Sequence, residues 1–292
     1  MDEKMINNEL NALISLLDEP DAAIFNRIRE RLFSYGVSAV PLLENAWDTS
    51  YNNSDVQKRI EDIIHDIQFD NVFQSLIKWK QTPQQDLLTG FLHLSRFHDP
   101  DLNDTEITNK IGMIIQDIWL ELNDNLTPLE KVKVINHIFF EVHAFSFNKA
   151  DVDSPANSWL NLLLETKKGN PVSLAILYII VSQSLKIPVF GVNLPQNFVL
   201  TYIDHMPENI RNLDRRNILF YINPANKGAV FTQREVDLFL RQIGLEVNNK
   251  YFLPCDNVTI IRRLVNTLIV SFEKKSNLEK AAELKKLQEA LE

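Results

Sequence analysis

Apolar residues in the first 70 positions recur at intervals of three or four, which is the spacing of one face of a helix. Polar stretches at 19–21, 35–37 and 49–55 separate four such groups. The pattern predicts four short helices, each with one buried face. Their apolar positions are Leu13, Ile14 and Leu17; Ile24, Ile28 and Leu32; Val40, Leu43 and Trp47; and Ile60, Ile63, Ile64 and Ile67.

This succession of short helices resembles HEAT-like helical repeats, in which each helix pair buries its apolar face against the next pair. With only about two units in the chain, an ordinary helical subdomain explains the pattern equally well. Helical spacing continues over residues 73–147. There Thr127, Pro128 and Glu130 form a capping-box pattern with proline at the first helical position, which predicts a helix from Leu129.

The middle of the chain predicts a helix that is enclosed on most sides. Gly169 is followed by Asn170 and Pro171, and these two residues suit the N-cap and the first helical position. The helix that follows is apolar nearly all round from Leu174 to Val181.

After Pro188 the apolar period changes from helical to two, which is the period of a strand. Three strands are predicted, and a polar surface loop at 204–217 separates the last two. A second capping box at Thr232 and Glu235 begins another helix, and Gly244 ends it. The strand residues are Val189 to Val192; Phe198, Leu200 and Tyr202; and Ile218, Phe220 and Ile222.

The tail returns to helical spacing, with one apolar face at 260–268 and a second, charge-rich segment at 278–291. A terminal helix docked on the body explains this segment, and a partner-binding hairpin of tetratricopeptide type is the sharper hypothesis. The sequence thus predicts a predominantly helical α+β protein with three regions. These are a HEAT-like helical region at 1–80, a core at 81–250 made of a buried helix on a small antiparallel sheet, and a C-terminal helical hairpin at 251–292.

Composition narrows the function classes. The 292 residues include seven glycines and one cysteine, which excludes a disulfide framework, a multi-cysteine zinc site and the glycine-rich nucleotide motifs. The net charge of −9 argues against nucleic acid as a partner. The N-terminus lacks the features of a signal peptide, and no apolar run approaches the length of a membrane span. We therefore expect a cytoplasmic protein without a membrane partner.

The order of the central elements points to a particular kind of site. A helix N-terminus at 170–173 comes first, then a strand start at Phe198, then a strand end at Asn223 and Pro224. In the transglutaminase and papain-like fold, these places hold a nucleophilic cysteine, a histidine and an aspartate. The helix N-terminus lowers the pKa of the thiol, the histidine takes its proton and the aspartate holds the imidazole.

Several segments strengthen this comparison, and together the chain resembles the SirB-type transglutaminase-like family from about residue 87 to residue 266. The segment 191–198, Gly-Val-Asn-Leu-Pro-Gln-Asn-Phe, is similar to the family signature G-V-x-L-P-G-H-F. The remaining matching segments are Asn157 to Leu160, Glu165 to Leu174, Leu87 to Leu102, Tyr251 to Pro254 and Arg262 to Asn266.

The resemblance also implies that the catalytic triad is degenerate. Counted without gaps from Gly169, the cysteine position falls on Pro171, and Ser173 lies two residues on. Asn197 stands where the family usually has histidine, and Asn223 where it has aspartate. A neutral amide neither accepts a proton at pH 7 nor stabilises an imidazolium. We therefore expect no catalysis, with Ser173, Asn197 and Asn223 as cleft residues.

Three functions remain open. The first is a non-catalytic scaffold, or a module that binds a peptide or protein partner. The second is a residual hydrolase or acyl transferase that uses Ser173 with an unrecognised base such as His205. The third is a cleft for a small polar ligand held by the two asparagines. Neither a cofactor nor a metal is expected, because the pairs His93/His98 and His137/His143 lack the spacing of helical metal ligands.

Overall fold

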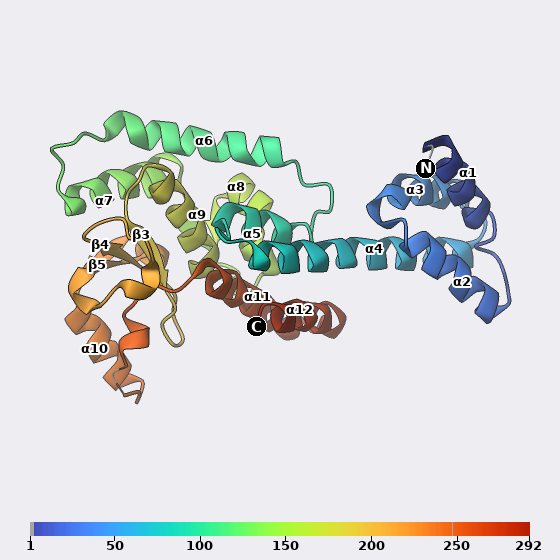
Figure 1. Ribbon diagram of the computed structural model, residues 1–292. Helices are drawn as coiled ribbons and strands as arrows, with labels where there is room; N and C mark the ends of the chain where they lie inside the picture. The colour runs from blue at the N-terminus through green and yellow to red at the C-terminus, as the bar shows by residue number, and fades with distance from the viewer. Residues whose placement is uncertain (1–2, 247) are drawn as a thin grey trace. The chain divides into compact units, whose positions relative to one another are not determined.

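The computed structural model describes residues 3–246 and 248–292, and the chain divides into two compact units, Met1–Ser75 and Leu76–Glu292. One long helix, α4 (Ser54–Gln81), begins in the first unit and ends in the second (Figure 1). The predicted limits at residues 80 and 250 remain predictions.

The first unit has a buried core formed by the helices that the apolar spacing predicts. These helices are α1 (Glu3–Ile14), α2 (Ala22–Phe33), α3 (Val40–Thr49) and the first part of α4. Leu17, Leu32, Leu43 and Ile60 are fully buried in this core. Ile24 and Trp47 were predicted on buried faces, but they are exposed, and each lies near an end of its helix.

The second unit combines helices with small sheets, as the α+β prediction states. Within the described residues of this unit, eight α-helices lie between residues 87 and 290. They are α5 (Leu87–Ser95), α6 (Asp104–Glu121), α7 (Pro128–Asn136), α8 (Leu160–Thr166), α9 (Pro171–Ser184), α10 (Gln233–Gln242), α11 (Asn257–Lys274) and α12 (Leu278–Ala290). A π-helical turn (His137–Val142) continues α7.

A four-stranded antiparallel sheet forms the centre of this unit, in the order β3-β4-β5-β6. Its strands are β3 (Val189–Val192), β4 (Val199–Ile203), β5 (Ile218–Asn223) and β6 (Ala229–Phe231). The sequence predicted the first three and missed β6. A second pair, β1 (Ser146–Phe147) and β2 (Lys168–Gly169), is parallel and was also not predicted.

The sheet is covered on both faces. Val199 and Tyr221 share a core with Val236 and Leu240 of α10, whereas α9 packs against β3 and β4 (Figure 1). All five residues of β4 are therefore buried, and its side chains do not alternate between core and solvent as predicted.

The predicted helix boundaries agree closely with the structure. α7 begins at Pro128, one residue before the predicted start, with the Thr127–Glu130 capping box formed. Asn170 caps α9, which is buried along most of its length, and Gly244 follows α10 in a left-handed conformation. The loop before β5 contains two 3-10 turns, and Leu213 between them is buried in the sheet core.

The last two helices pack against each other, and α11 also contacts α5 and α9 of the second unit. The tetratricopeptide-like and HEAT-like interpretations of the two ends of the chain remain predictions. No helix within the described residues is long and apolar enough to cross a membrane.

Candidate functional site

The N-terminus of α9 is closed by the side chains of its own first turn. The Asn170 Oδ1 atom accepts hydrogen bonds from the backbone N–H groups of Val172 and Ser173, both at 2.9 Å. Pro171 stands at the first helical position, where its missing N–H costs no hydrogen bond. This turn is the place that the family resemblance assigns to the nucleophile.

Ser173 is fully buried, and its hydroxyl group serves the backbone. Its Oγ donates to the carbonyl of Asn157 at 2.6 Å and accepts from the N–H of Asn170 at 3.0 Å. Neither partner is a histidine, a lysine or a carboxylate. A serine that closes a capping box in this way has its hydrogen bonds satisfied by the fold, which is a structural role.

The segment around Asn157 completes this closure. Asn170 Nδ2 donates to Ser158 Oγ at 2.7 Å, and Asn148 Nδ2 donates to Asn157 Oδ1 at 2.8 Å. Asn157, Ser158, Asn170 and Ser173 are all buried. We call these four residues the α9 latch. Because buried polar groups are costly when unpaired, each member of the latch depends on the others.

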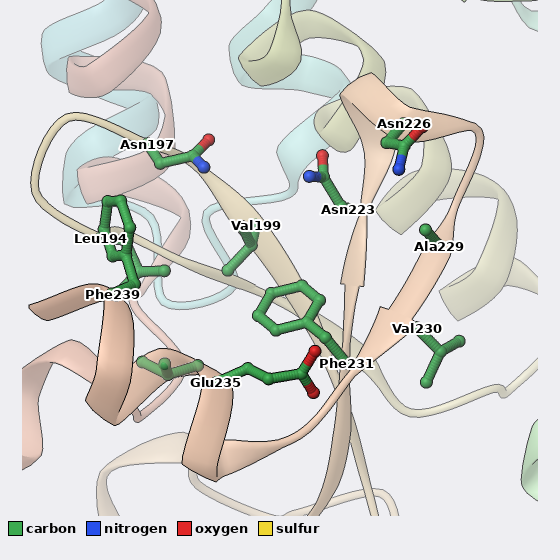
Figure 2. A pocket seen from close by; sticks show the side chains of 11 residues that line it. Leu194, Asn197, Val199, Asn223, Asn226, Ala229, Val230, Phe231, Glu235 and Phe239 are labelled. Atoms are coloured by element: carbon green, nitrogen blue, oxygen red, sulfur yellow. The ribbon is translucent and has the colours of Figure 1, made fainter. Parts of the chain in front are cut away.

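Asn197 and Asn223, by contrast, line one common pocket of about 320 Å³. The pocket lies at the end of the sheet, on the face that α10 covers, and Figure 2 shows both asparagines on one side of it. Asn223 closes β5, and Asn197 immediately precedes Phe198, which leads into β4. Pro171 and Ser173 are not among its lining residues, so the structure joins only two of the four predicted site residues.

The backbone determines how the two amides are oriented. Asn197 Oδ1 accepts from the N–H of Phe198 at 2.9 Å, and Asn223 Oδ1 accepts from the N–H of Ala225 at 3.1 Å. Each oxygen is thus engaged, and each Nδ2 group remains as a donor. In Figure 2 the nitrogen of Asn223 lies on the side facing Asn197. The pair therefore offers hydrogen-bond donors to the pocket.

The opposite side of the pocket carries a carboxylate that sequence reasoning assigned only to a helix cap. Glu235 Oε2 accepts from Thr232 N at 2.7 Å and from Thr232 Oγ1 at 2.9 Å. These hydrogen bonds lower the pKa of Glu235, so the side chain is anionic at neutral pH. Asn226 and the apolar side chains of Leu194, Val199, Val230, Phe231, Val236 and Phe239 complete the lining, with Ala229.

Comparison with known proteins places these elements in a family. The family model described as the transglutaminase-like superfamily matches residues 105–266, more than half of the chain and all of the pocket lining. The chain belongs to the transglutaminase-like superfamily. Both the α9 latch and the pocket therefore lie inside the superfamily domain.

Relatives share parts of this domain at low identity. A UPF0162 protein of Xylella fastidiosa (strain 9a5c) is 26% identical over 203 residues, which are 67% of this chain and 68% of that protein. A second UPF0162 protein, from strain Temecula1, is 31% identical over 115 residues, 39% of this chain and 41% of that protein. Mouse F-box only protein 21 is 25% identical over 150 residues, 51% of this chain and 23% of that protein. No solved structure matches the chain.

His205, the alternative base within the superfamily domain, lies in the loop after β4. Its Nδ1 atom is 2.6 Å from Asp204 Oδ1, and its side chain is 63% exposed. It makes no hydrogen bond with the buried Ser173 in the described part of the chain. The two residues of the hydrolase hypothesis therefore do not form a catalytic pair.

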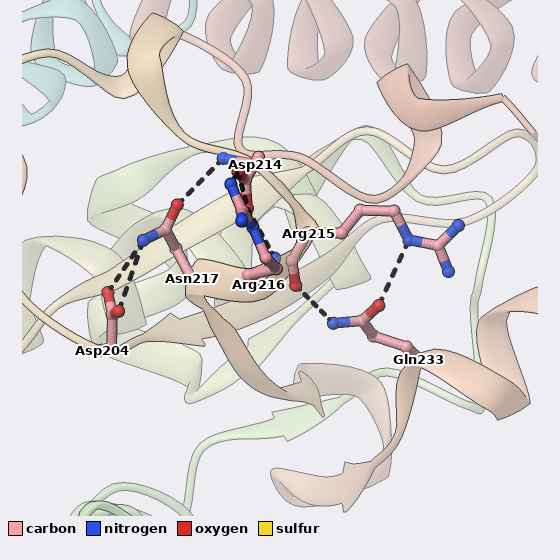
Figure 3. Close-up of polar contacts among 6 residues, drawn as sticks. All are labelled: Asp204, Asp214, Arg215, Arg216, Asn217 and Gln233. Atoms are coloured by element: carbon pink, nitrogen blue, oxygen red, sulfur yellow. Dashed lines mark hydrogen bonds and ion pairs between the residues drawn. The ribbon is translucent and has the colours of Figure 1, made fainter.

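The loop that carries His205 is held by its own polar contacts, which Figure 3 shows. Asn217 Oδ1 accepts from the N–H of Asp214 at 3.0 Å, and its Nδ2 group donates to Asp204 at 3.3 Å. Arg215 Nε donates to Gln233 Oε1 at 3.2 Å, and its guanidinium lies 3.7 Å from the centre of the Phe252 ring. The contacts of Arg215 with Gln233 tie the loop to the start of α10.

Cys255 lies outside the pocket lining. Its Sγ atom donates to the carbonyl of Gly191 at 3.3 Å, and burial raises the pKa of the thiol to about 12. A thiol with so high a pKa is a poor nucleophile at neutral pH. Among residues 3–246 and 248–292, no group of three His, Cys, Asp or Glu side chains is arranged to hold a metal ion.

Proposed function

We propose that this protein is a non-catalytic, SirB-type member of the transglutaminase-like superfamily, and that its core binds a segment of a partner protein. The observation that carries the proposal is the α9 latch. The hydroxyl nearest to the expected nucleophile position is fully buried, and its hydrogen bonds go to Asn157 and Asn170.

The residues at the other two expected positions support the same conclusion. Asn197 and Asn223 carry uncharged amides, which bind polar groups but do not take protons at neutral pH. The loss of catalytic members of such a unit typically lowers the rate by several orders of magnitude. What remains at this end of the sheet is a pocket with donors and an apolar lining, which suits recognition better than chemistry.

A protein partner is favoured by the way in which the domain is used elsewhere. In F-box only protein 21, the segment similar to this chain makes up 23% of that protein, so the segment there is one part of a much longer chain. We take this place within a longer chain as support for a protein partner, and the affinity purification described below tests it. A small polar ligand is the second candidate, because the pocket volume of about 320 Å³ lies in the range of small-molecule sites.

The proposal is tested by incubating the protein with a defined peptide mixture, with and without an added primary amine, and analysing the products by mass spectrometry. We expect no cleaved or amine-linked peptide from the wild-type chain. Turnover by the wild-type chain that disappears in Ser173→Ala, measured at a temperature at which circular dichroism shows both chains to be folded, would overturn the proposal. Thr127→Ala, which alters the cap of α7 outside the pocket lining, is the matched control.

Two further measurements extend the test. Affinity purification from the native cell should recover a partner in stoichiometric amount, which an enzyme that releases its products does not require. The triple variant Pro171→Cys, Asn197→His and Asn223→Asp would place the triad residue types at the three positions that the family resemblance assigns to them. Turnover by this variant would support the assignment of the three positions.

A further inference from the structure

The pocket lies beside an edge of the sheet whose backbone groups have no partner strand. β6 pairs with β5 on one side only, and it is the last strand in the sheet order. All three of its residues, Ala229, Val230 and Phe231, also line the pocket. Among residues 3–246 and 248–292, no hydrogen bond other than those to β5 involves the backbone of β6. An edge of this kind pairs with an added strand.

The pocket beside this edge has the polarity of a site for an extended peptide. At one end, the Nδ2 groups of Asn197 and Asn223 are donors, because their oxygens accept backbone hydrogen bonds. The natural partner of such donors is a carbonyl oxygen, which every peptide unit presents. Between the ends, Val199, Phe231 and Phe239 provide an apolar surface for one side chain.

The charge of the pocket determines which side chain the ligand carries near Glu235. Among the described residues that line the pocket, Glu235 alone is charged, and one of its carboxylate oxygens, Oε1, makes no hydrogen bond with them. Lys227 and Arg234 are close in sequence, but neither lines the pocket. An anionic ligand would therefore meet an uncompensated like charge, whereas a lysine or arginine side chain would find a partner.

We propose that β6 and this pocket form the docking site for an extended segment of a partner protein, with an apolar residue over Phe231 and a basic residue at Glu235. This inference rests on the proposed function and names the chemistry of the partner. Side chains two apart in a strand lie on the same face. The matching segment therefore has its basic residue two positions from its apolar residue.

The test uses the full ¹⁵N-labelled chain and acetylated, amidated tetrapeptides as probes. Ala-Leu-Ala-Lys should shift the side-chain NH₂ signals of Asn197 and Asn223 and the backbone signals of β6, and should bind at least about five times more tightly than Ala-Leu-Ala-Glu. The same peptide with N-methylated backbone nitrogens should lose most of its binding, since it cannot pair with an edge. The proposal would be overturned if the signal changes were confined to other surfaces. It would also be overturned if no signal changed at about 10 mM peptide, because the dissociation constant would then lie above any concentration that matters for recognition.

Three variants sharpen this result. Glu235→Gln keeps a helix-capping side chain but should remove the preference for lysine over glutamate. Asn197→Ala should lower the affinity for Ala-Leu-Ala-Lys about three- to tenfold, which corresponds to the loss of one hydrogen bond. Asn209→Ala removes a loop asparagine away from the pocket and should leave binding unchanged. Equal affinities for all four chains would reject the site.

The failure of this inference can be distinguished from the failure of the proposed function. Mass spectrometry of the peptides after titration reports whether they remain intact. Cleaved or amine-linked peptide would refute the non-catalytic proposal while leaving the docking site in place. Intact peptide with no perturbation of the pocket would refute only the docking site.

Discussion

Gly169 shows how tightly single residues are constrained beside the α9 latch. A Cβ atom built at this position would lie 2.7 Å from Ser173 Oγ and 2.8 Å from Leu163 Cδ1. Gly169→Ala should therefore destabilise the second unit by about 1–3 kcal/mol, because the buried neighbours must shift to make room. Urea denaturation followed by circular dichroism measures this change.

Gly112 supplies the matched control for that substitution. It lies in α6 and is exposed, and apart from its chain neighbours and the backbone of its own helix no atom lies within 4 Å of a built Cβ. Gly112→Ala should stabilise the protein by about 0.5–1 kcal/mol, because alanine loses less backbone entropy in a helix. If both alanine variants change stability in the same direction, the packing argument at Gly169 is wrong.

The single cysteine gives a pH-dependent prediction. An unfolded thiol has a pKa of about 8.5, and in the folded chain the pKa is raised to about 12. The fold thus favours the protonated thiol, and the stability it contributes is present below pH 8.5 and lost as the pH rises toward 12. At pH 8.5, labelling of Cys255 by iodoacetamide should be about a thousandfold slower in the native protein than in guanidinium chloride. Equal labelling rates in the two states would contradict the burial of the thiol.

The candidate site was predictable at some residues and not at others. Asn197 and Asn223 were predicted from the family resemblance, and the structure places both in the lining of one pocket, while their role as binding residues stays a prediction. Ser173 was predicted as a cleft residue, but its burial depends on Asn157, which is 16 positions away and has no local signal. Glu235 was explained completely by its capping pattern. Its place in the pocket depends on α10 packing over the sheet, and no short sequence pattern encodes that packing.

At the scale of elements, a buried helix cap should contribute more to the free energy of unfolding than an exposed one. Asn170→Ala removes the acceptor for two backbone N–H groups and the donor to the buried Ser158. The expected loss is about 2–4 kcal/mol. Thr232→Ala, at the exposed N-terminus of α10, should cost about 0.5–1 kcal/mol. Chemical denaturation of the two variants measures both, and equal losses would show that the latch adds nothing to an ordinary cap.

Elements with a strong local signal were predicted, and those that depend on distant partners were not. Capping boxes at Thr127 and Thr232 involve residues three apart, and Asn170 directly precedes Pro171 at the start of α9, so the sequence reveals these three helix starts directly. β1 and β2 have two residues each and are 20 positions apart, too short for any periodicity. β6 has three residues and no alternation. β4 was found, but its two buried faces became clear only with α9 and α10 in place.

At the scale of the whole molecule, each unit has a buried core of its own. Leu43 belongs to the core of the first unit, and Leu240 to the core between α10 and the sheet. Leu43→Ala should cost about 2–5 kcal/mol and speed amide exchange in α1, α2 and α3 while leaving α9 protected. Leu240→Ala should speed amide exchange in the second unit, including α9, while leaving α1, α2 and α3 protected. Hydrogen exchange with mass spectrometry resolves the two, and uniform loss of protection would mean that the units unfold together.

The net charge is also divided unevenly between the units. Residues 1–75 contain 14 acidic and 6 basic side chains, a net charge of −8, whereas the remaining residues contain 25 and 24, a net charge of −1. The second unit, which contains the superfamily domain, is thus almost neutral. The preference for a basic peptide that we propose is therefore local to Glu235, and general attraction to an acidic domain does not account for it.

The α9 latch has a consequence for how related sequences should be compared. Its side chains satisfy one another in the interior, so substitution of any one is penalised through stability, whatever the domain does. Selection for folding alone would then keep the Asn-Pro-x-Ser segment and the Asn-Ser pair before α8 in many descendants. Persistence of that signature among relatives is expected of enzymes and non-enzymes alike. Variation at Asn197, Asn223 and Glu235, which cap local turns and line the pocket, is the better guide to where function has diverged.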